Sequence, residues 1–277
     1  MRIGFLGAGV MAQAFARGII ASGTFSAENM CASCPPRDTP LLEMISKLGV
    51  GSVYHDNTQV VDKSDIVFLS VKPIHVKKVV SEIAPRMDRN KLLVSIAMGI
   101  NIRSIEALLP KKCRVVRVMP NTPSIVRAGA AGYSMGQSCL EGDSETVREL
   151  LSCVGYAVEL PEKLIDGITG LSGSGPSYMF CIVEAMADAG VKLGIPRDLA
   201  LTLSAHTMLG AAKMLLETGR HPAQLKDDVQ SPAGSSIYGM HQLEKSGLRG
   251  IIMDTIWAAA ERSRETGEGA QEREREL

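Results

Sequence analysis

The sequence has no excess of charge of either sign and no long hydrophobic run. Its 30 Lys and Arg residues balance its 30 Asp and Glu residues, so the formal net charge is zero at pH 7. Without a basic field the chain has no long-range attraction for nucleic acid or for an anionic membrane surface. Apolar runs such as Ile66–Val71 and Leu92–Ala97 are far shorter than the roughly 20 residues that span a bilayer. We therefore expect a small-molecule partner, with neither nucleic acid nor membrane bound.

Residues that bind metals or form disulfides are also scarce. Six cysteines with irregular spacing make no disulfide framework in a chain of 277 residues. A redox or zinc site at the pair Cys31 and Cys34 would need a second ligand pair or a helix that begins at the first cysteine. Neither is apparent, so two reduced structural thiols are the favoured interpretation. The five histidines lack metal-ligand spacing, and we expect no metal site.

Short runs of bulky apolar residues alternate with helical patterns over residues 1–162. Strands are expected at 2–7, 29–33, 65–71, 91–96 and 114–119, with further candidates at 129–135 and 155–159. Helices are expected between them at 10–21, 40–48, 75–84 and 102–108. This alternation predicts an α/β domain with a parallel, doubly wound sheet.

The sequence changes character over residues 163–277. Long stretches rich in Ala, Leu and Met predict an all-helical second domain. Helices at 176–193 and 196–218 each begin with proline and end near glycine. Because these helices carry little charge, we expect them to bury surface against a second copy of the chain, with packing inside one monomer as the alternative. The tail from Glu261, rich in Arg and Glu, is expected to be solvated and frayed.

A glycine-rich turn joins the first expected strand to the first expected helix. Residues 7–12 read Gly-Ala-Gly-Val-Met-Ala, which fits G-x-G-x-x-A. Gly7 permits the tight turn, Gly9 lets the backbone approach a pyrophosphate, and Ala12 lets the helix pack on the strand. The helix N-terminus then offers free N–H groups and a positive dipole end to phosphate. This context predicts a Rossmann domain that binds a nicotinamide dinucleotide in an oxidoreductase.

The end of the second expected strand bears on which dinucleotide binds. An NAD enzyme usually places Asp or Glu there to bind the ribose hydroxyls. Residues 32–37 read Ala-Ser-Cys-Pro-Pro-Arg, so no carboxylate stands at that strand end. Small side chains with Arg37 nearby favour NADPH, with NADH as the alternative cofactor. Arg37 as an ordinary surface residue is the competing interpretation.

Polar residues also follow two other expected strands and occur in two glycine- and serine-rich clusters. Lys72 follows one strand and could face phosphate or be a surface lysine, and Asn121 follows another and could orient a ligand or form a turn. Clusters of glycine and serine at 170–176 and 227–236 interrupt the helical half. A serine-rich turn that opens a helix suits a carboxylate, and a plain N-cap is the alternative.

These segments together closely resemble the pyrroline-5-carboxylate reductases. The resemblance covers nearly the whole chain in that family's order and rests on the opening turn, Ser70–Pro73, Met119–Pro123, Thr169–Pro176 and His221–Asp227 with the serine loop after it. It implies a Rossmann domain followed by an all-α dimerisation domain that interlocks with a second subunit, with dimers commonly assembled into decamers. The implied reaction is reduction of the cyclic imine of pyrroline-5-carboxylate to L-proline with NADPH or NADH, the last step of proline biosynthesis. A cytoplasmic location is expected because no targeting segment is apparent, although some animal members are mitochondrial.

The resemblance also implies which residues form the site. Those implied for the cofactor are Leu6, Gly7, Ala8, Gly9, Val10, Met11, Cys34, Asn57, Ser70, Val71, Lys72, Pro73, Ile96, Ala97 and Met98. Those implied for the substrate are Val229, Ser231, Gly234, Ser235 and Ser236. Backbone N–H groups of Ser235 and Ser236 would hold the substrate carboxylate, and the Ser236 hydroxyl would orient the ring nitrogen as the catalytic group.

The serine loop departs from the family at two positions. Ala233 stands where the family usually has glycine, and Ser236 stands where it usually has threonine. The hydroxyl is retained, but the loop would change shape if position 233 requires a positive φ. Two other functions stay open. A β-hydroxyacid dehydrogenase would rely on a lysine in the helical region, where Lys163 and Lys192 match no motif, and a non-catalytic NADP sensor would not need the serine loop.

Overall fold

The computed structural model describes residues 1–275. Contacts divide the chain into a first unit, Met1–Ser174 together with the residues from Trp257 onward, and a second unit, Gly175–Ile256. The two units are defined by contacts within the chain, and the domain boundary predicted between residues 162 and 163 stays a prediction. Each unit is described by itself.

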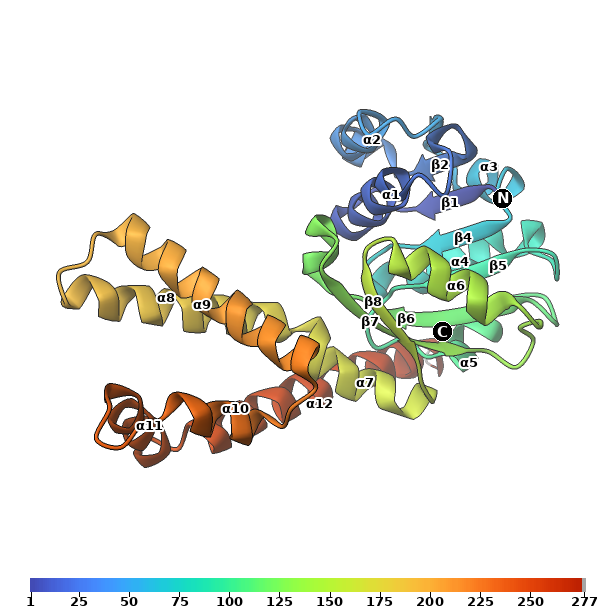
Figure 1. Ribbon diagram of the computed structural model, residues 1–277. Coiled ribbons are helices and arrows are strands. Elements are labelled where there is room, and N and C mark those ends of the chain that lie inside the picture. The colour runs from blue at the N-terminus through green and yellow to red at the C-terminus, as the bar shows by residue number, and fades with distance from the viewer. Residues whose placement is uncertain (276–277) are drawn as a thin grey trace. The chain divides into compact units, whose positions relative to one another are not determined.

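An eight-stranded sheet forms the centre of the first unit, in the order β3-β2-β1-β4-β5-β6-β7-β8 (Figure 1). The strands are β1 (Ile3–Leu6), β2 (Met30–Ser33), β3 (Ser52–Tyr54), β4 (Ile66–Leu69), β5 (Leu92–Ser95), β6 (Arg114–Met119), β7 (Gly129–Met135) and β8 (Gly155–Glu159). Neighbouring strands are parallel except at β6 and β7, which pair antiparallel. The doubly wound α/β prediction is confirmed, with the correction that the sheet is mixed, because β7 runs opposite to β6.

Hydrophobic side chains of the central strands alternate between two buried clusters. Phe5 and Phe68 lie in one cluster with their rings stacked at 5.2 Å between centroids, while Leu6 and Leu69 lie in the other. Helices α1 (Val10–Ser22), α2 (Thr39–Ser46) and α6 (Asp143–Ser152) pack on the first cluster, and α3 (Asn57–Asp62), α4 (Val76–Ile83) and α5 (Ile102–Glu106) pack on the second. Because both faces are covered, these strands appear in the sequence as uninterrupted apolar runs.

The second unit contains helices, as predicted. They are α8 (Gly175–Lys192), α9 (Arg197–Thr218), α10 (Pro222–Val229), α11 (Ser235–Lys245) and the start of α12 (Leu248–Arg275). Helix α8 packs against α9, so closely that a Cβ on Gly190 would lie 3.0 Å from the Cβ of Ala200.

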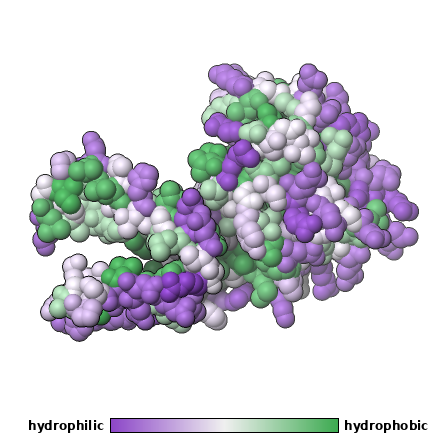
Figure 2. All heavy atoms as spheres, viewed as in Figure 1, coloured by the Kyte–Doolittle hydropathy of each residue, from purple (hydrophilic) through white to green (hydrophobic). Residues whose placement is uncertain are grey.

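Almost no side chains are buried in the second unit. Only four residues of α8 and α9 are buried, namely Gly175, Ala187, Ala200 and Ser204, and α10 and α11 bury none. Large apolar side chains are exposed instead, and Figure 2 shows hydrophobic atoms at the surface of the α8–α9 pair. Among them are Phe180, Leu193, Leu199, Leu203, Leu209 and Leu216. Helix α9 is also long and apolar enough to cross a membrane by length and composition, which is weak evidence because core helices pass the same test.

The expectation of a frayed C-terminal tail is wrong for residues 261–269. Helix α12 runs unbroken to Arg275, and Ser263 and Gly267 are buried within it. The charged side chains Arg262, Arg264, Glu265 and Glu268 are exposed on this helix, which is why composition alone indicated solvation. The last two residues of the predicted tail, Glu276 and Leu277, lie outside the described residues.

Candidate functional site

The carboxyl ends of four parallel strands place the predicted cofactor residues at one edge of the sheet. Leu6, Ser33, Leu69 and Ser95 end β1, β2, β4 and β5, and the strand pairing aligns them in one row. The strand order reverses between β1 and β4, and ligands of doubly wound sheets bind beyond the strand ends at such a switch point. The predicted residues that follow these strands are therefore brought together, namely Gly7–Met11, Cys34, Ser70–Pro73 and Ile96–Met98.

The two glycines of the turn are required for different reasons. Gly7 has φ of 96°, and a Cβ there would lie 2.6 Å from the carbonyl oxygen of Ser70, so the protein itself excludes a side chain. Gly9 has φ of −70°, a conformation open to any residue, and no atom lies within 4 Å of where its Cβ would be. The space beside Gly9 is thus left open at the N-terminus of α1, where a phosphate would lie.

The N-terminus of α1 is free to bind an anion. Gly9 supplies no side-chain cap, and the first turn contains no acidic residue. The first N–H groups of a helix have no partner within it, and they carry the positive end of the helix dipole. Nearby, the Ser70 hydroxyl is buried without a hydrogen-bond partner. An unpaired buried hydroxyl and an open helix N-terminus at one sheet edge fit a dinucleotide that carries phosphate and ribose oxygens.

The two carboxylates near the end of β2 each have a partner. The Asp38 carboxylate lies 3.7 Å from Nε of Arg37, and Asp56 caps α3 by accepting a hydrogen bond of 2.8 Å from the Thr58 N–H. Asn57, at the start of α3, is held toward this edge because its Oδ1 accepts a 2.7 Å hydrogen bond from the Ser33 hydroxyl. Arg37 is exposed. The end of β2 therefore has small side chains with an exposed arginine nearby, as the sequence indicated.

Cys31 and Cys34 are separate buried thiols. The Cys34 thiol donates a 3.1 Å hydrogen bond to the carbonyl oxygen of Asp38, and burial together with the Asp38 carboxylate raises its pKa. Burial likewise raises the pKa of Cys31, which contacts the Ser64 hydroxyl at 3.4 Å. Within residues 1–275 no group of three His, Cys, Asp or Glu side chains could hold a metal ion. These contacts support the interpretation of two structural thiols.

Asn121 and Lys72 differ in how the structure uses them. Both ends of the Asn121 amide bond the backbone: its Oδ1 accepts a 2.9 Å hydrogen bond from the Ala130 N–H, and its Nδ2 donates to the Ser172 carbonyl at 3.1 Å. These two bonds support the interpretation of Asn121 as a turn former over its interpretation as a ligand-orienting residue. Lys72 is exposed at the start of a short 3-10 helix, Pro73–His75.

The predicted substrate loop, Ser231–Ser236, joins α10 to α11 in the second unit. The Gly234 N–H donates a 3.0 Å hydrogen bond to the Ser231 carbonyl, and a Cβ on Gly234 would collide with the Ser231 hydroxyl. Gly234 is the N-cap of α11 without a side-chain cap, and the first turn of α11 has no acidic residue. The N–H groups of Ser235 and Ser236 begin the helix, so they have no partner within it. This second open helix N-terminus could bind a carboxylate.

Ala233 has a positive φ in this structure. The angle is +60°, so the loop has a left-handed residue at this position although alanine and not glycine occupies it. The left-handed conformation costs an L-residue about 1–2 kcal/mol. Strain of this kind persists only where the surrounding structure holds the backbone in place.

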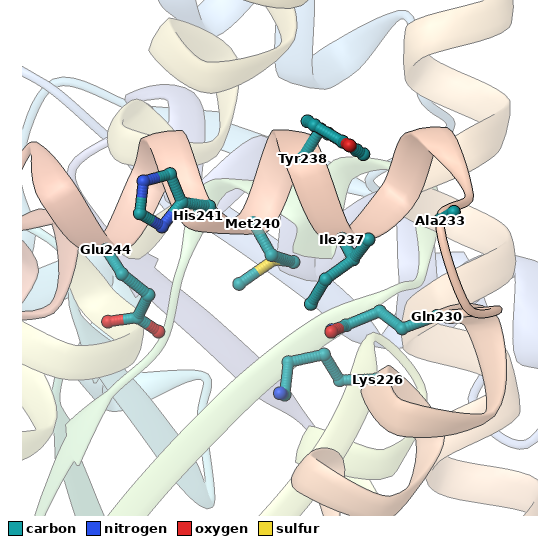
Figure 3. Close-up of a pocket in the computed structure, with 8 residues that line it drawn as sticks. All are labelled: Lys226, Gln230, Ala233, Ile237, Tyr238, Met240, His241 and Glu244. Atoms are coloured by element: carbon teal, nitrogen blue, oxygen red, sulfur yellow. The ribbon is translucent and has the colours of Figure 1, made fainter.

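A cavity of about 580 Å³ lies between α10 and α11. In Figure 3, Lys226 from α10 and Gln230 just after that helix point toward Ile237 and Met240 from α11. The Nε2 atom of Gln230 is buried without a partner. Of the substrate loop only Ala233 lines this cavity. The predicted substrate residues thus lie beside it and not within it.

Two protein families match the chain in separate segments. Residues 2–99 match the family described as NADP oxidoreductase coenzyme F420-dependent. Residues 162–266 match the family described as pyrroline-5-carboxylate reductase dimerisation. The first match covers the residues predicted to bind the cofactor, and the second covers the serine loop.

Individual relatives align over nearly the whole chain. The pyrroline-5-carboxylate reductase of Arabidopsis thaliana is 44% identical, with 95% of each chain covered. That of Methanosarcina acetivorans is 45% identical, covering 96% of this chain and 98% of the relative. Among solved structures, Plasmodium falciparum pyrroline carboxylate reductase with NADP bound matches with a TM-score of 0.87 and 31% identity, covering 96% of this chain and 98% of that one.

Proposed function

The chain belongs to the pyrroline-5-carboxylate reductase family, and we propose that the sheet edge holds its cofactor while the α10–α11 loop holds its substrate. The protein is an NAD(P)H-dependent oxidoreductase that reduces the C=N bond of L-1-pyrroline-5-carboxylate to give L-proline, the final step of proline biosynthesis. One observation supports a cofactor site at the sheet edge and a substrate site at the α10–α11 loop. Each of these two places presents a glycine-capped helix N-terminus with no acidic residue in its first turn, α1 for phosphate and α11 for carboxylate.

At the sheet edge, the residues act by binding and orientation. The turn Leu6–Met11 would hold the pyrophosphate, and Ser70–Pro73, Ile96–Met98, Cys34 and Asn57 would hold the rest of the cofactor. When bound, the reduced nicotinamide supplies the hydride for the C=N bond. The Ser70 hydroxyl, which is buried without a partner within the protein, would gain one from the bound cofactor. Placing the two reactants in register supplies much of the rate acceleration.

At the α11 N-terminus, backbone and side chain act on different parts of the substrate. The N–H groups of Ser235 and Ser236 bind the carboxylate, and Ser231, Gly234 and Val229 shape the loop around it. The Ser236 hydroxyl hydrogen-bonds the ring nitrogen and sets which face of the ring is presented. A protonated cyclic imine is already electrophilic near neutral pH, so no strong general acid is required.

NADPH is the proposed physiological cofactor in place of NADH. The carboxylate that follows β2, Asp38, lies 3.7 Å from Nε of Arg37, and the Arg37 side chain stays 72% exposed. Arginine binds phosphate through paired N–H donors, which makes Arg37 the group that distinguishes the two cofactors.

Replacement of Arg37 tests this preference. We expect Arg37→Ala to raise the KM for NADPH about tenfold, equivalent to about 1.4 kcal/mol, and to leave the KM for NADH unchanged. Lys47→Ala, which removes a different exposed cation just beyond α2, is the matched control and should change neither constant. If the KM values of wild type and Arg37→Ala are equal for both cofactors, Arg37 is an ordinary surface residue.

The second unit supports a homodimer, which we propose assembles further to a decamer. Its helices bury almost nothing within one chain, and Leu193 and Leu216 are each 82% exposed. Apolar surface of this extent is normally covered by another subunit. Sedimentation equilibrium at micromolar concentration should show dimers or a multiple of them. A folded monomer under those conditions would contradict the proposal.

The cytoplasm is the proposed location. All six cysteines are free thiols, and Cys31, Cys34, Cys113 and Cys153 are buried as such, which suits a reducing compartment. Cell fractionation that recovers the protein with mitochondria would contradict this location.

A further inference from the structure

The loop after β5 is packed directly against α12. This loop connects β5 to α5 and begins with Ile96–Met98, the segment proposed to lie beside the cofactor. Gly99 follows it, is buried, and has φ of +77°. A Cβ on Gly99 would lie 2.6 Å from the carbonyl oxygen of Ser263 and 3.1 Å from the nitrogen of Gly267, both in α12. The loop and the helix therefore meet backbone to backbone.

Gly267 is the matching feature on the helix. It is buried, and a Cβ there would collide with the carbonyl oxygen of Gly99. Glycine inside a helix costs about 1 kcal/mol relative to alanine, so its presence calls for a packing reason. Gly269, two residues further on, has no atom within 4 Å of its Cβ position and supplies a comparison within the same helix.

A buried polar network holds α12 at this contact. Ser263 is fully buried, and its hydroxyl donates a 2.7 Å hydrogen bond to Oδ1 of Asp166. The same carboxylate accepts a 2.7 Å hydrogen bond from Arg117, whose side chain is 3% exposed on β6. Glu162 accepts a 2.7 Å hydrogen bond from the N–H of Ile102, where α5 begins, and lies 3.5 Å from Arg117. The far end of the loop is thus tied to the network that holds the helix.

We infer that Gly267 is a positioning residue for the cofactor and acts through Gly99. This inference rests on the proposed function, which places the cofactor against Ile96–Met98. A side chain at position 267 must displace either the helix or the Gly99 carbonyl, and the network resists movement of the helix. The displacement therefore falls on the loop, one residue from Met98, and changes the surface offered to the cofactor.

Alanine substitutions at Gly267 and Gly269 separate positioning from helix propensity. Both replace a glycine of α12 with the same side chain, and only Gly267→Ala meets an obstacle. We expect Gly267→Ala to raise the dissociation constant for NADPH about tenfold, equivalent to about 1.4 kcal/mol, when NADPH fluorescence is titrated without substrate. The KM for pyrroline-5-carboxylate at saturating NADPH should change less than about twofold, because the substrate loop is elsewhere in the chain. Gly269→Ala should change neither constant.

A wild-type dissociation constant in folded Gly267→Ala would overturn the inference, as would an equal rise in Gly269→Ala. If Gly267→Ala does not fold, Ser263→Ala provides the test, because it removes one bond of the network and keeps both glycines. We expect that variant to raise the NADPH dissociation constant by about two- to fivefold, or less than 1 kcal/mol, and an unchanged constant would overturn the inference. Wild-type protein that binds NADPH without reducing pyrroline-5-carboxylate would instead contradict the function, and the titrations would still report on Gly267.

Discussion

Gly9→Ala is expected to raise the dissociation constant for NADPH by at least about a hundredfold, or about 2.7 kcal/mol, in a protein that remains folded. The Cβ has free space in the protein without cofactor, since no atom lies within 4 Å of its position. That same space is where backbone and pyrophosphate must approach each other, so the methyl group excludes the ligand and not the fold. Fluorescence titration with NADPH measures the loss, and thermal unfolding measures the fold.

Gly7→Ala is the informative contrast because it lies in the same turn. Its φ of 96° and the carbonyl oxygen of Ser70 oppose any side chain, so we expect this variant to lose stability as well as cofactor affinity. If Gly9→Ala binds NADPH like wild type, the open space beside α1 is not the pyrophosphate site. If Gly9→Ala unfolds with Gly7→Ala, the two glycines are not separable in the way proposed.

Ser236→Ala is expected to lower kcat for pyrroline-5-carboxylate reduction by roughly ten- to a hundredfold, consistent with losing one hydrogen bond that orients the ring nitrogen. The NADPH dissociation constant should not change, since Ser236 belongs to the substrate loop. Ser236→Thr keeps the hydroxyl and should keep most of the rate. Steady-state kinetics at saturating NADPH measures both variants.

Ser246→Ala is the matched control for Ser236→Ala, because Ser246 is exposed at the opposite end of the same helix. It should leave kcat unchanged. Unchanged kcat in Ser236→Ala would remove this hydroxyl from the mechanism, and the open N-terminus of α11 would then act on the carboxylate alone.

The turn and the central strands of the first unit could be predicted from the sequence because their signals are local. The turn at Gly7–Ala12 joins a buried strand to a helix, and two covered faces make β1, β4 and β5 continuous apolar runs. Strand β3 was not predicted, because three half-exposed or exposed residues at a sheet edge carry no such run. Helices α3 and α6 were not predicted either. Helix α3 is only six residues long and α6 is strongly charged, so neither shows a long apolar stripe.

Contacts between distant parts of the chain were beyond prediction. The charged tail from Glu261 gave no sign that Ser263 and Gly267 lie buried against Gly99, because the matching surface is more than 160 residues away in the sequence. The direction of β7 and the use of the Asn121 amide by Ala130 and Ser172 depend on tertiary structure in the same way. The substrate loop was recognised by family resemblance, since a serine-rich helix start is equally typical of a plain N-cap.

Oxidation of NADPH by the purified protein, with pyrroline-5-carboxylate as the only other reactant, tests the central claim most directly. We predict loss of NADPH absorbance at the rate at which L-proline forms, one molecule for each NADPH consumed, and no oxidation of 3-hydroxy acids in the reverse direction. Tight NADPH binding without proline formation would contradict it and would indicate a sensor, and oxidation of 3-hydroxy acids would indicate a dehydrogenase.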